Sequence, residues 1–231
     1  MEYRRLVDYE RKVFDLFDNK TIISIPDKNL IQHDNKKEIH VIPNGVDHSF
    51  FKPIDKEKKY AVVFTGNMGY PPNVDAAGYL INEIMPIVWK KIPTAKVLLA
   101  GASPSRKVTN LQSNLVVVSG WLDDIRDAYS SARVFIAPMR IGTGLQNKLL
   151  EAMSMKIPSI TTPLANDALQ AKDGYEILIG KDAEELSKSI IKLIEDKKTY
   201  DQLAINGYNF VHNNHSWEKA TEKLHIIINN S

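Results

Sequence analysis

The 231-residue sequence contains no cysteine. Disulfide bonds and thiolate metal sites are therefore excluded, and the composition fits a reducing compartment. No apolar run approaches the roughly 18 residues that a membrane-spanning helix needs, and the first residues, Met1 to Arg5, lack the apolar core of a signal peptide. We therefore expect a soluble, cytoplasmic protein whose contact with a membrane is at most peripheral, through the lysine-rich segment 50–59 or the last helix.

The sequence also lacks a surplus of charge of either sign. Lysine and arginine number 30 and the acidic residues 28, which gives a formal net charge of +2. A dedicated nucleic-acid-binding domain carries a concentrated basic surplus, so we expect no nucleic-acid partner. The six histidines have no ligand-like spacing with one another. We therefore expect no metal site and no other cofactor.

What is present is enough apolar residues, 43%, to fill a core. From residue 60 onward, short apolar strands alternate with helical patterns, as in a parallel sheet covered by helices on both faces. This predicts a doubly wound, Rossmann-like α/β sheet, in which ligands bind beyond the carboxyl ends of the strands. The predicted strands are 60–65, 96–100, 114–119, 133–137, 159–162 and 176–179. The predicted helices are 73–91, 123–132, one from about 144, 183–195, 199–211 and 217–228, the first two capped by Asn73 and Asp123.

Roughly the first 27 residues are too few to form a hydrophobic core of their own. Residues 3–18 have the pattern of a charged amphipathic helix, and 21–25 that of a short strand closed by Pro26 and Asp27. This segment is either a helix packed on the edge of the main domain or the tail of a domain that is missing. The Pro-Asn-Gly-Val-Asp sequence at 43–47 predicts a turn, and a linker follows it.

The most informative stretch is 138–153, which follows a predicted buried strand. Two glycines lead into a helix predicted to begin near Gly144, and a strand that turns through glycines onto a helix start forms an anion site. Lys148 and Glu151 lie three residues apart, on nearly the same face of that helix. They would suit a phosphate group and ribose hydroxyls. The alternative is structural: Thr143 with Gln146 matches a capping box, and Lys148 with Glu151 could be a surface ion pair.

At this point the sequence resembles a known family. Blocks at 41–47, 64–68 with 72–76, 120–126 and 138–153, with His215-Ser216-Trp217 before the last helix, are similar to the C-terminal, donor-binding half of a retaining GT-B glycosyltransferase. The family is glycosyl transferases group 1 (GT4-like), and the resemblance is closest to a bacterial branch that makes surface polysaccharides. It implies that residues 1–45 are a remnant of the N-terminal acceptor domain plus linker, and that 46–231 form the Rossmann-like donor domain.

The resemblance also implies a nucleoside-diphosphate sugar as donor and a role for each site residue. Glu151 would bind the ribose, and Lys148 and Arg140 would neutralise the diphosphate and so act in catalysis. Trp121 and Leu122 would border the base, although Trp121 could equally be core and Arg140 a solvent-facing charge. The remaining donor-binding residues would be Gly66, Asn67, Met68, Gly142, Thr143, Gly144, Leu145 and Gln146.

The implied reaction is transfer of a sugar to a glycan or lipid-linked acceptor with retention of the anomeric configuration. Its acceptor domain would be part of the full protein or a separate chain, and this chain alone would turn over nothing. Three residues depart from the family pattern: Thr143 replaces a glutamate, Asn67 a basic residue and Gln146 an arginine. Thr143 and Asn67 motivate an alternative, a non-catalytic nucleotide-binding or interaction module. A nucleotide-sugar epimerase would need a carboxylate or histidine pair near the sugar, and none is obvious.

Overall fold

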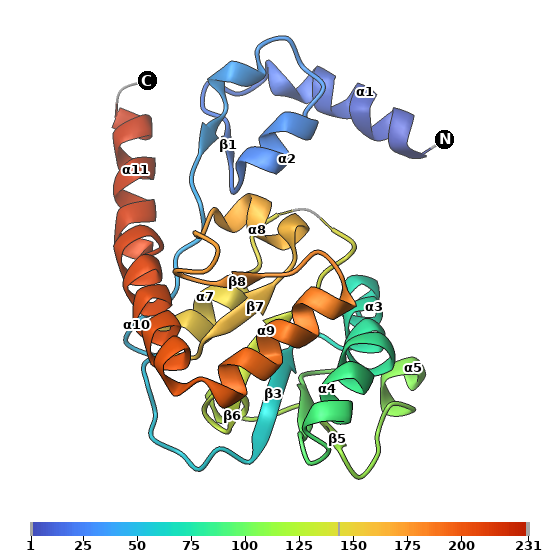
Figure 1. Ribbon diagram of the computed structural model, residues 1–231. Helices are drawn as coiled ribbons and strands as arrows, with labels where there is room; N and C mark the ends of the chain where they lie inside the picture. Colours follow the sequence, from blue (N-terminus) through green and yellow to red (C-terminus); the bar gives the residue numbers. More distant parts are fainter. Residues whose placement is uncertain (1, 143, 230–231) are drawn as a thin grey trace.

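The computed structural model describes residues 2–142 and 144–229, and its centre is a six-stranded parallel sheet (Figure 1). The strands are β3 (Tyr60–Thr65), β4 (Val97–Ala100), β5 (Val116–Gly120), β6 (Ala132–Ala137), β7 (Ser159–Thr161) and β8 (Leu178–Ile179). Their order is β5-β4-β3-β6-β7-β8, so the chain runs outward from β3 to one edge and then returns to start the other half at β6. This is the doubly wound, Rossmann-like topology that the sequence predicts, with its switch point between β3 and β6.

The central strands β3, β4 and β6 are buried on both faces over most of their length, which explains their continuous apolar sequences. In β3, Val62, Val63 and Phe64 have no exposed surface. Val62 pairs with Val97 on one side and with Val134 on the other, so the central strand carries branched side chains against both neighbours. Helices cover both faces of such a sheet and leave its carboxyl edge open for a ligand.

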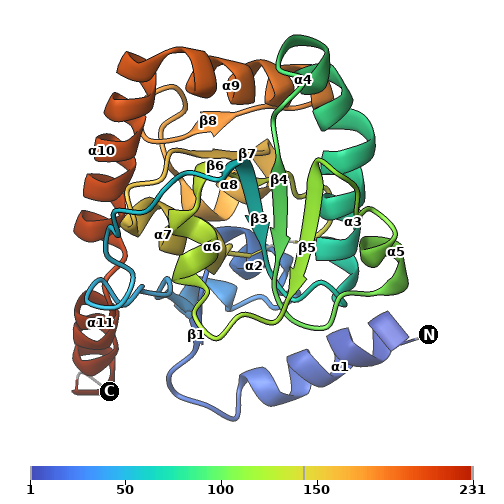
Figure 2. The ribbon, with the colours of Figure 1, turned by 90° about the horizontal axis from the view of Figure 1, so that it is seen from below.

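One face is covered by the helical segment from α3 to α4, together with α9, and the other by α6 and α7, with α10 packed on α7 (Figure 2). The helices of this part are α3 (Pro71–Tyr79), η2 (Leu80–Ile84), α4 (Met85–Lys91), α5 (Arg106–Thr109), α6 (Arg126–Ser130), α7 (Asn147–Ser154), α8 (Pro163–Leu169), α9 (Ala183–Glu195), α10 (Lys197–Asn214) and α11 (Trp217–Asn229). The short helices α5 and α8 were not expected from the sequence.

The helix predicted over 73–91 is interrupted and starts earlier. Its middle, η2, is a π-helical turn just before Pro86. Proline has no amide hydrogen and its ring crowds the preceding turn, so a widened turn accommodates it. The two predicted caps are wrong. Tyr70 stands at the N-cap of α3, so Asn73 lies inside that helix, and Ile125 instead of Asp123 stands at the N-cap of α6.

The N-terminal unit, residues 2–45, lies above the carboxyl edge of the sheet in Figure 1. It consists of α1 (Glu2–Phe14), β1 (Thr21–Ile22), α2 (Ile25–Leu30), the 3-10 turn η1 (Lys36–Glu38) and β2 (His40–Val41), with β1 parallel to β2. The strand predicted over 21–25 is shorter than expected, because Ser24 caps α2 and Pro26 occupies its first turn.

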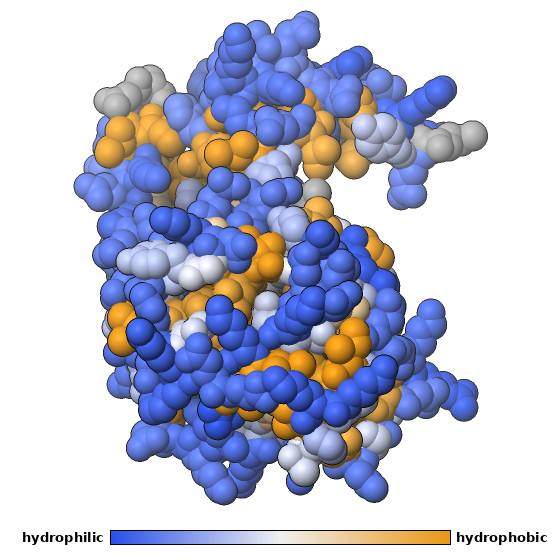
Figure 3. All heavy atoms as spheres, in the orientation of Figure 1, coloured by the Kyte–Doolittle hydropathy of each residue, from blue (hydrophilic) through white to orange (hydrophobic). Residues whose placement is uncertain are grey.

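The N-terminal unit buries few of its own apolar side chains. Phe14 is buried and stacks on the His33 ring, at 3.8 Å between centroids. Most of the other large apolar side chains of α1 and the following turn are exposed, and Figure 3 shows apolar surface on the underside of the unit. The exposed ones are Tyr3, Leu6, Tyr9, Leu16 and Phe17.

The turn at 43–47 joins the N-terminal unit to the main domain by packing on the start of α11. The Val46 amide donates to the carbonyl of His215 at 3.0 Å. A Cβ at Gly45 would overlap the backbone of Ser216 and Trp217, so only glycine permits this approach. The structure therefore brings together the 43–47 and 215–217 blocks, which are far apart in the sequence.

Candidate functional site

A cleft of about 540 Å³ lies at the carboxyl edge of the sheet, at its switch point. We call it the switch-point cleft. Loops after β3, β4 and β5 form one wall, and the segment that leads into α7 forms the other. Its lining residues are Phe50, Thr65, Gly66, Asn67, Asn73, Gly101, Ala102, Trp121, Leu122, Asp123, Ile125, Leu145, Gln146, Asn147, Lys148 and Glu151.

Lys148 is the cation of this cleft and is half-buried. Its Nζ donates to Oδ1 of Asn73 at 2.6 Å and lies 4.8 Å from the centroid of the Phe64 ring. Burial lowers the pKa of Lys148 to about 8, and the negative charge of Glu151 opposes that shift. The ammonium thus has a neutral hydrogen-bond partner and keeps an uncompensated positive charge that an anionic ligand could use.

Glu151 is also half-buried, and its partner is another side chain. The Tyr129 hydroxyl donates to Oε2 of Glu151 at 2.5 Å. Burial raises the pKa of Glu151, while the Tyr129 bond and the charge of Lys148 lower it. Lys148 and Glu151 therefore do not form the surface ion pair considered from the sequence. Lys148 bonds to Asn73 of α3, and Glu151 accepts from Tyr129 of α6.

The loop after β3 approaches both the lysine and the loop after β4. A Cβ at Gly101 would overlap the carbonyl oxygen of Gly66, and one at Gly66 would lie 2.7 Å from Nδ2 of Asn73 and 3.2 Å from Nζ of Lys148. Both glycines have positive φ angles, +153° at Gly66 and +140° at Gly101. Glycine at these positions lets backbone reach a ligand in the cleft. Asn67 lines the cleft, whereas Met68 is fully buried beneath it.

The loop after β5 supplies an aromatic edge to the cleft. Trp121 is 74% exposed and lines the cleft together with Leu122. The alternative that Trp121 belongs to the core is therefore wrong. A flat, exposed indole at the rim can cover a planar ligand group.

The structure does not bring Arg140 to Lys148, contrary to what the resemblance implies. The Arg140 guanidinium binds Asp75 at 2.8 and 3.1 Å and Glu83 at 3.2 Å, and it lies 4.2 Å from the Tyr79 ring centroid. These partners belong to α3 and η2, and Arg140 lines a separate cavity of about 830 Å³. Asp75 raises the pKa of Arg140. Two carboxylates hold the side chain away from the cleft.

The glycine segment before α7 differs from expectation in where the helix begins. Helix α7 starts at Asn147, so Gln146 stands at its N-cap, without a side-chain capping bond. Leu145 and Gln146 line the cleft, whereas Gly142 and Gly144 are not among its lining residues. Gly144 lies against Asp27 of the N-terminal unit. Thr143, and with it the capping box, lies outside the described residues.

Sequence reasoning missed Tyr129 altogether and gave Asn73 the wrong role. An isolated tyrosine in a short helix has the appearance of core, and an asparagine before a helical pattern has that of a cap. The signal that could have found them was the need for partners: a cation and a carboxylate on a half-buried helix face require hydrogen-bonding side chains from neighbouring elements.

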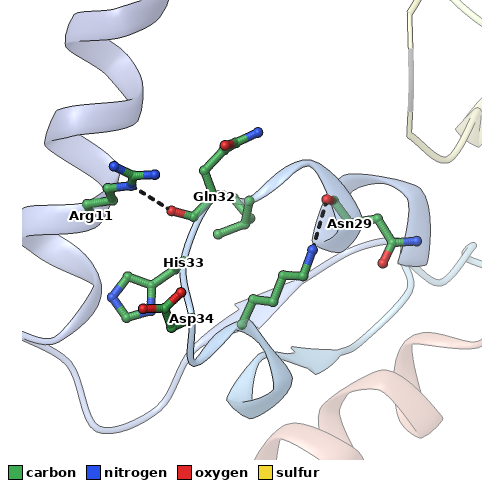
Figure 4. Close-up of a pocket in the computed structure, with 7 residues that line it drawn as sticks. Arg11, Asn29, Gln32, His33 and Asp34 are labelled. Atoms are coloured by element: carbon green, nitrogen blue, oxygen red, sulfur yellow. Dashed lines mark hydrogen bonds between the residues drawn. The ribbon is translucent and has the colours of Figure 1, made fainter.

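A third cavity, of about 700 Å³, lies in the N-terminal unit (Figure 4). There the Arg11 Nε donates to the carbonyl of Gln32 at 2.9 Å, beside His33 and Asp34. None of the site residues predicted from the sequence lines it. Within residues 2–142 and 144–229, no group of three or more His, Asp or Glu side chains could hold a metal ion, and no helix is long and apolar enough to cross a membrane.

The doubly wound sheet, with a cleft at its switch point that holds a cation and a carboxylate, defines a Rossmann-like α/β domain with the fold found in GT-B glycosyltransferases. Residues 59–196, more than half of the chain, match the family model described as glycosyl transferases group 1. The chain belongs to that family.

Two curated relatives and one solved structure illustrate the similarity. An uncharacterized 44.6 kDa protein in the cps region of Klebsiella pneumoniae is 23% identical over 172 residues, which are 71% of this chain and 44% of that protein. An uncharacterized glycosyltransferase of Methanocaldococcus jannaschii is 30% identical over 96 residues, 41% of this chain and 24% of that protein. The chain thus spans less than half the length of these relatives.

The solved structure is Anabaena HepE in complex with UDP and glucose. It superposes with a TM-score of 0.81 at 13% sequence identity, over 97% of this chain and 67% of the HepE chain. At this identity the likeness establishes the fold.

Proposed function

We propose that the chain is the C-terminal, donor-binding part of a retaining glycosyltransferase, and that the switch-point cleft binds a nucleoside-diphosphate sugar. The observation that carries the proposal is the pair Lys148 and Glu151, half-buried in one cleft with no bond between them. A cation and a carboxylate so placed can take the two polar ends of a ribosyl diphosphate. The binding of UDP by HepE, a structural neighbour, supports the same ligand class.

In this proposal each side chain has a chemical task. The Lys148 ammonium neutralises the diphosphate, whose negative charge grows as the glycosidic bond breaks, and so stabilises the departing nucleoside diphosphate. The Glu151 carboxylate accepts hydrogen bonds from the ribose hydroxyls. Backbone at Gly66 and Gly101 approaches the phosphates, and Trp121 with Leu122 borders the base. Orientation of the donor toward the acceptor supplies much of the remaining rate.

We further propose that residues 1–45 belong to the acceptor side and that 46–231 form the donor domain. The exposed apolar side chains of α1 support this division, because they would be covered by an acceptor-binding domain of the full protein or of a second chain. The acceptor would be a glycan or a lipid-linked glycan. The position of the Klebsiella relative in a cps region supports a place in surface-polysaccharide synthesis.

A second candidate is a binding module without catalysis. The observation that favours it is the pairing of Arg140 with Asp75 and Glu83, which leaves less positive charge for a leaving diphosphate. The two functions share donor binding and differ in turnover. A hydrolysis or transfer assay on the chain joined to its acceptor domain would separate them.

The proposal is tested by isothermal titration calorimetry with UDP-glucose, ADP-glucose and GDP-mannose. We expect one of them to bind, and Glu151→Ala to weaken that binding at least tenfold, because a hydrogen bond to a charged group contributes about 1.5–3 kcal/mol. The control is Glu222→Ala, an exposed carboxylate on α11, which should leave the affinity unchanged. No heat with any of the three donors, or equal affinity in Glu151→Ala, would contradict the proposal.

A further inference from the structure

Lys148 and Glu151 are each bonded by a side chain from a different helix, at the wall of the switch-point cleft or behind it. Asn73 comes from α3 and Tyr129 from α6, and they are 6% and 0% exposed. Buried polar groups of this kind are costly unless they are bonded, so their partners indicate what they do.

Asn73 connects the Lys148 ammonium to the loop after β3. Its Oδ1 accepts from Lys148 Nζ at 2.6 Å, and its Nδ2 donates to the carbonyl of Asn67 at 2.9 Å. The amide orientation is fixed by chemistry, because an ammonium only donates and a carbonyl only accepts. One buried amide thereby sets the distance between the cation and the glycine loop at 66–67.

Tyr129 holds the Glu151 carboxylate in a similar way. A phenol has one hydrogen, and Tyr129 donates it to Oε2 of Glu151 at 2.5 Å. The contact between the Tyr129 hydroxyl and Oγ1 of Thr65, at 2.8 Å, therefore has the threonine as donor. The chain from Thr65 through Tyr129 to Glu151 delivers a donor to the carboxylate and favours its ionised form.

We propose that Asn73 and Tyr129 are positioning residues of the donor site: Asn73 orients the Lys148 ammonium and Tyr129 orients the Glu151 carboxylate, and each keeps its partner charged. This proposal rests on the function proposed above, because it assigns roles toward the ligand of the same cleft. The contrasting role is plain packing of α3 and α6 against the sheet, which would affect stability alone.

The two roles differ in how binding depends on pH. Asp123, Lys148 and Glu151 are the titratable side chains among the described residues that line the cleft, with Tyr129 behind them. The affinity for an anionic donor should fall at low pH, where Glu151 becomes protonated, and at high pH, where Lys148 loses its proton. We call these two falls the acid limb and the alkaline limb of the pH profile. If Tyr129 and Asn73 are positioning residues, each controls one of these two limbs.

The Asn73 arm of the experiment measures UDP-glucose affinity by calorimetry from about pH 5 to about pH 9 in the full 231-residue chain. Asn73→Ala removes the acceptor of the ammonium, so we expect about tenfold weaker binding at neutral pH and an alkaline limb moved to lower pH by about one unit. Asn73→Asp places a carboxylate against Lys148, so the alkaline limb should move upward, out of the measured range. Asn166→Asp, a partly buried amide of α8 bonded to the Ala171 backbone, is the control for structural damage and should leave both limbs in place.

The Tyr129 arm uses Tyr129→Phe, which keeps the ring and removes the donor to Glu151. The acid limb should move to higher pH by about one unit, with about tenfold weaker binding at neutral pH and the alkaline limb unchanged. Tyr200→Phe, a tyrosine of α10 outside the cleft, is the control and should move neither limb. Thermal unfolding of every variant reports structural damage separately.

Limb shifts that follow this pattern support the positioning role. Weaker binding with a lower melting temperature and unshifted limbs would overturn it in favour of packing, and so would variants that bind like the unaltered chain. If UDP-glucose fails, ADP-glucose and GDP-mannose replace it as probes. If none of the three binds the unaltered chain, the proposed function itself fails, and the positioning role fails with it.

Discussion

Helix α3 contributes side chains to two cavities, and the two treat their cations in opposite ways. In the switch-point cleft, Lys148 bonds to the neutral amide of Asn73. In the separate cavity of about 830 Å³, Arg140 bonds to the carboxylates of Asp75 and Glu83. The pKa shifts also run in opposite directions: burial lowers the pKa of Lys148 to about 8, whereas the bond to Asp75 raises the pKa of Arg140.

The difference shows where an anionic ligand would find attraction. A cation already neutralised by two carboxylates offers little net charge, and an exposed ion pair of this kind contributes modestly to stability. A partly desolvated ammonium with a neutral partner is less stable in its charged form and gains most when an anion arrives. The switch-point cleft, where the Lys148 ammonium is partly desolvated and has no anionic hydrogen-bond partner, is therefore the candidate phosphate site. The cavity of Arg140, whose charge is already paired with two carboxylates, is not.

The largest effect that would sharpen this comparison is expected for Lys148→Met. Loss of the ammonium should weaken UDP-glucose binding about a hundredfold, because a charge-assisted bond contributes up to about 3 kcal/mol. The melting temperature should change little, because the removal of a desolvated charge offsets the loss of the hydrogen bond to Asn73. Calorimetry and thermal unfolding measure the two quantities.

The control for that variant is Lys90→Met, which changes an exposed lysine of α4 outside the cleft. It should leave the affinity as it is. If UDP-glucose binds the Lys148→Met variant as tightly as the unaltered chain, the comparison of the two cavities fails. The ammonium of Lys148 would then not contribute to binding the ligand, whatever its hydrogen-bond partner.

A smaller effect is expected from pH in the unaltered chain. The pKa of Lys148 is depressed to about 8, so the side chain is charged below that pH and neutral above it. Affinity for UDP-glucose should be steady from about pH 6.5 to about pH 7.5 and then fall toward about tenfold per pH unit above pH 8. Calorimetry across this range measures it, and Lys148→Met should lack the fall. An affinity that stays constant to about pH 9 would contradict the depressed pKa.

The sequence predicted the fold well where a local pattern decides the structure. The strand at 60–65 and the helix at 183–195 have the boundaries that their apolar periodicity indicates. The parallel, doubly wound topology follows from the alternation of such elements. Pro26 was misread as the end of a strand, because it stands in the first turn of α2, where proline is well tolerated.

The candidate site was predictable in outline, because Lys148 and Glu151 share one helix face and the cleft lies at the predicted edge of the sheet. Their partners were not predictable. Tyr129 is 22 residues from Glu151 and Asn73 is 75 from Lys148, and no local pattern reports contacts between such distant positions. The same holds for Arg140, whose partner Asp75 is 65 residues away.

The smallest effect, and the one that most directly tests the comparison, is expected for Arg140→Gln. If its two carboxylates already satisfy Arg140, the affinity for UDP-glucose should change by less than about twofold, because no bond to the ligand is lost. The free energy of unfolding should fall by roughly 0.5–1 kcal/mol, as for a partly exposed ion pair. Calorimetry and chemical denaturation measure the two. A tenfold loss of affinity would mean that Arg140 leaves Asp75 and Glu83 when the donor binds. The two cavities would then act as one site, in which Arg140 exchanges its two carboxylate partners for the bound donor.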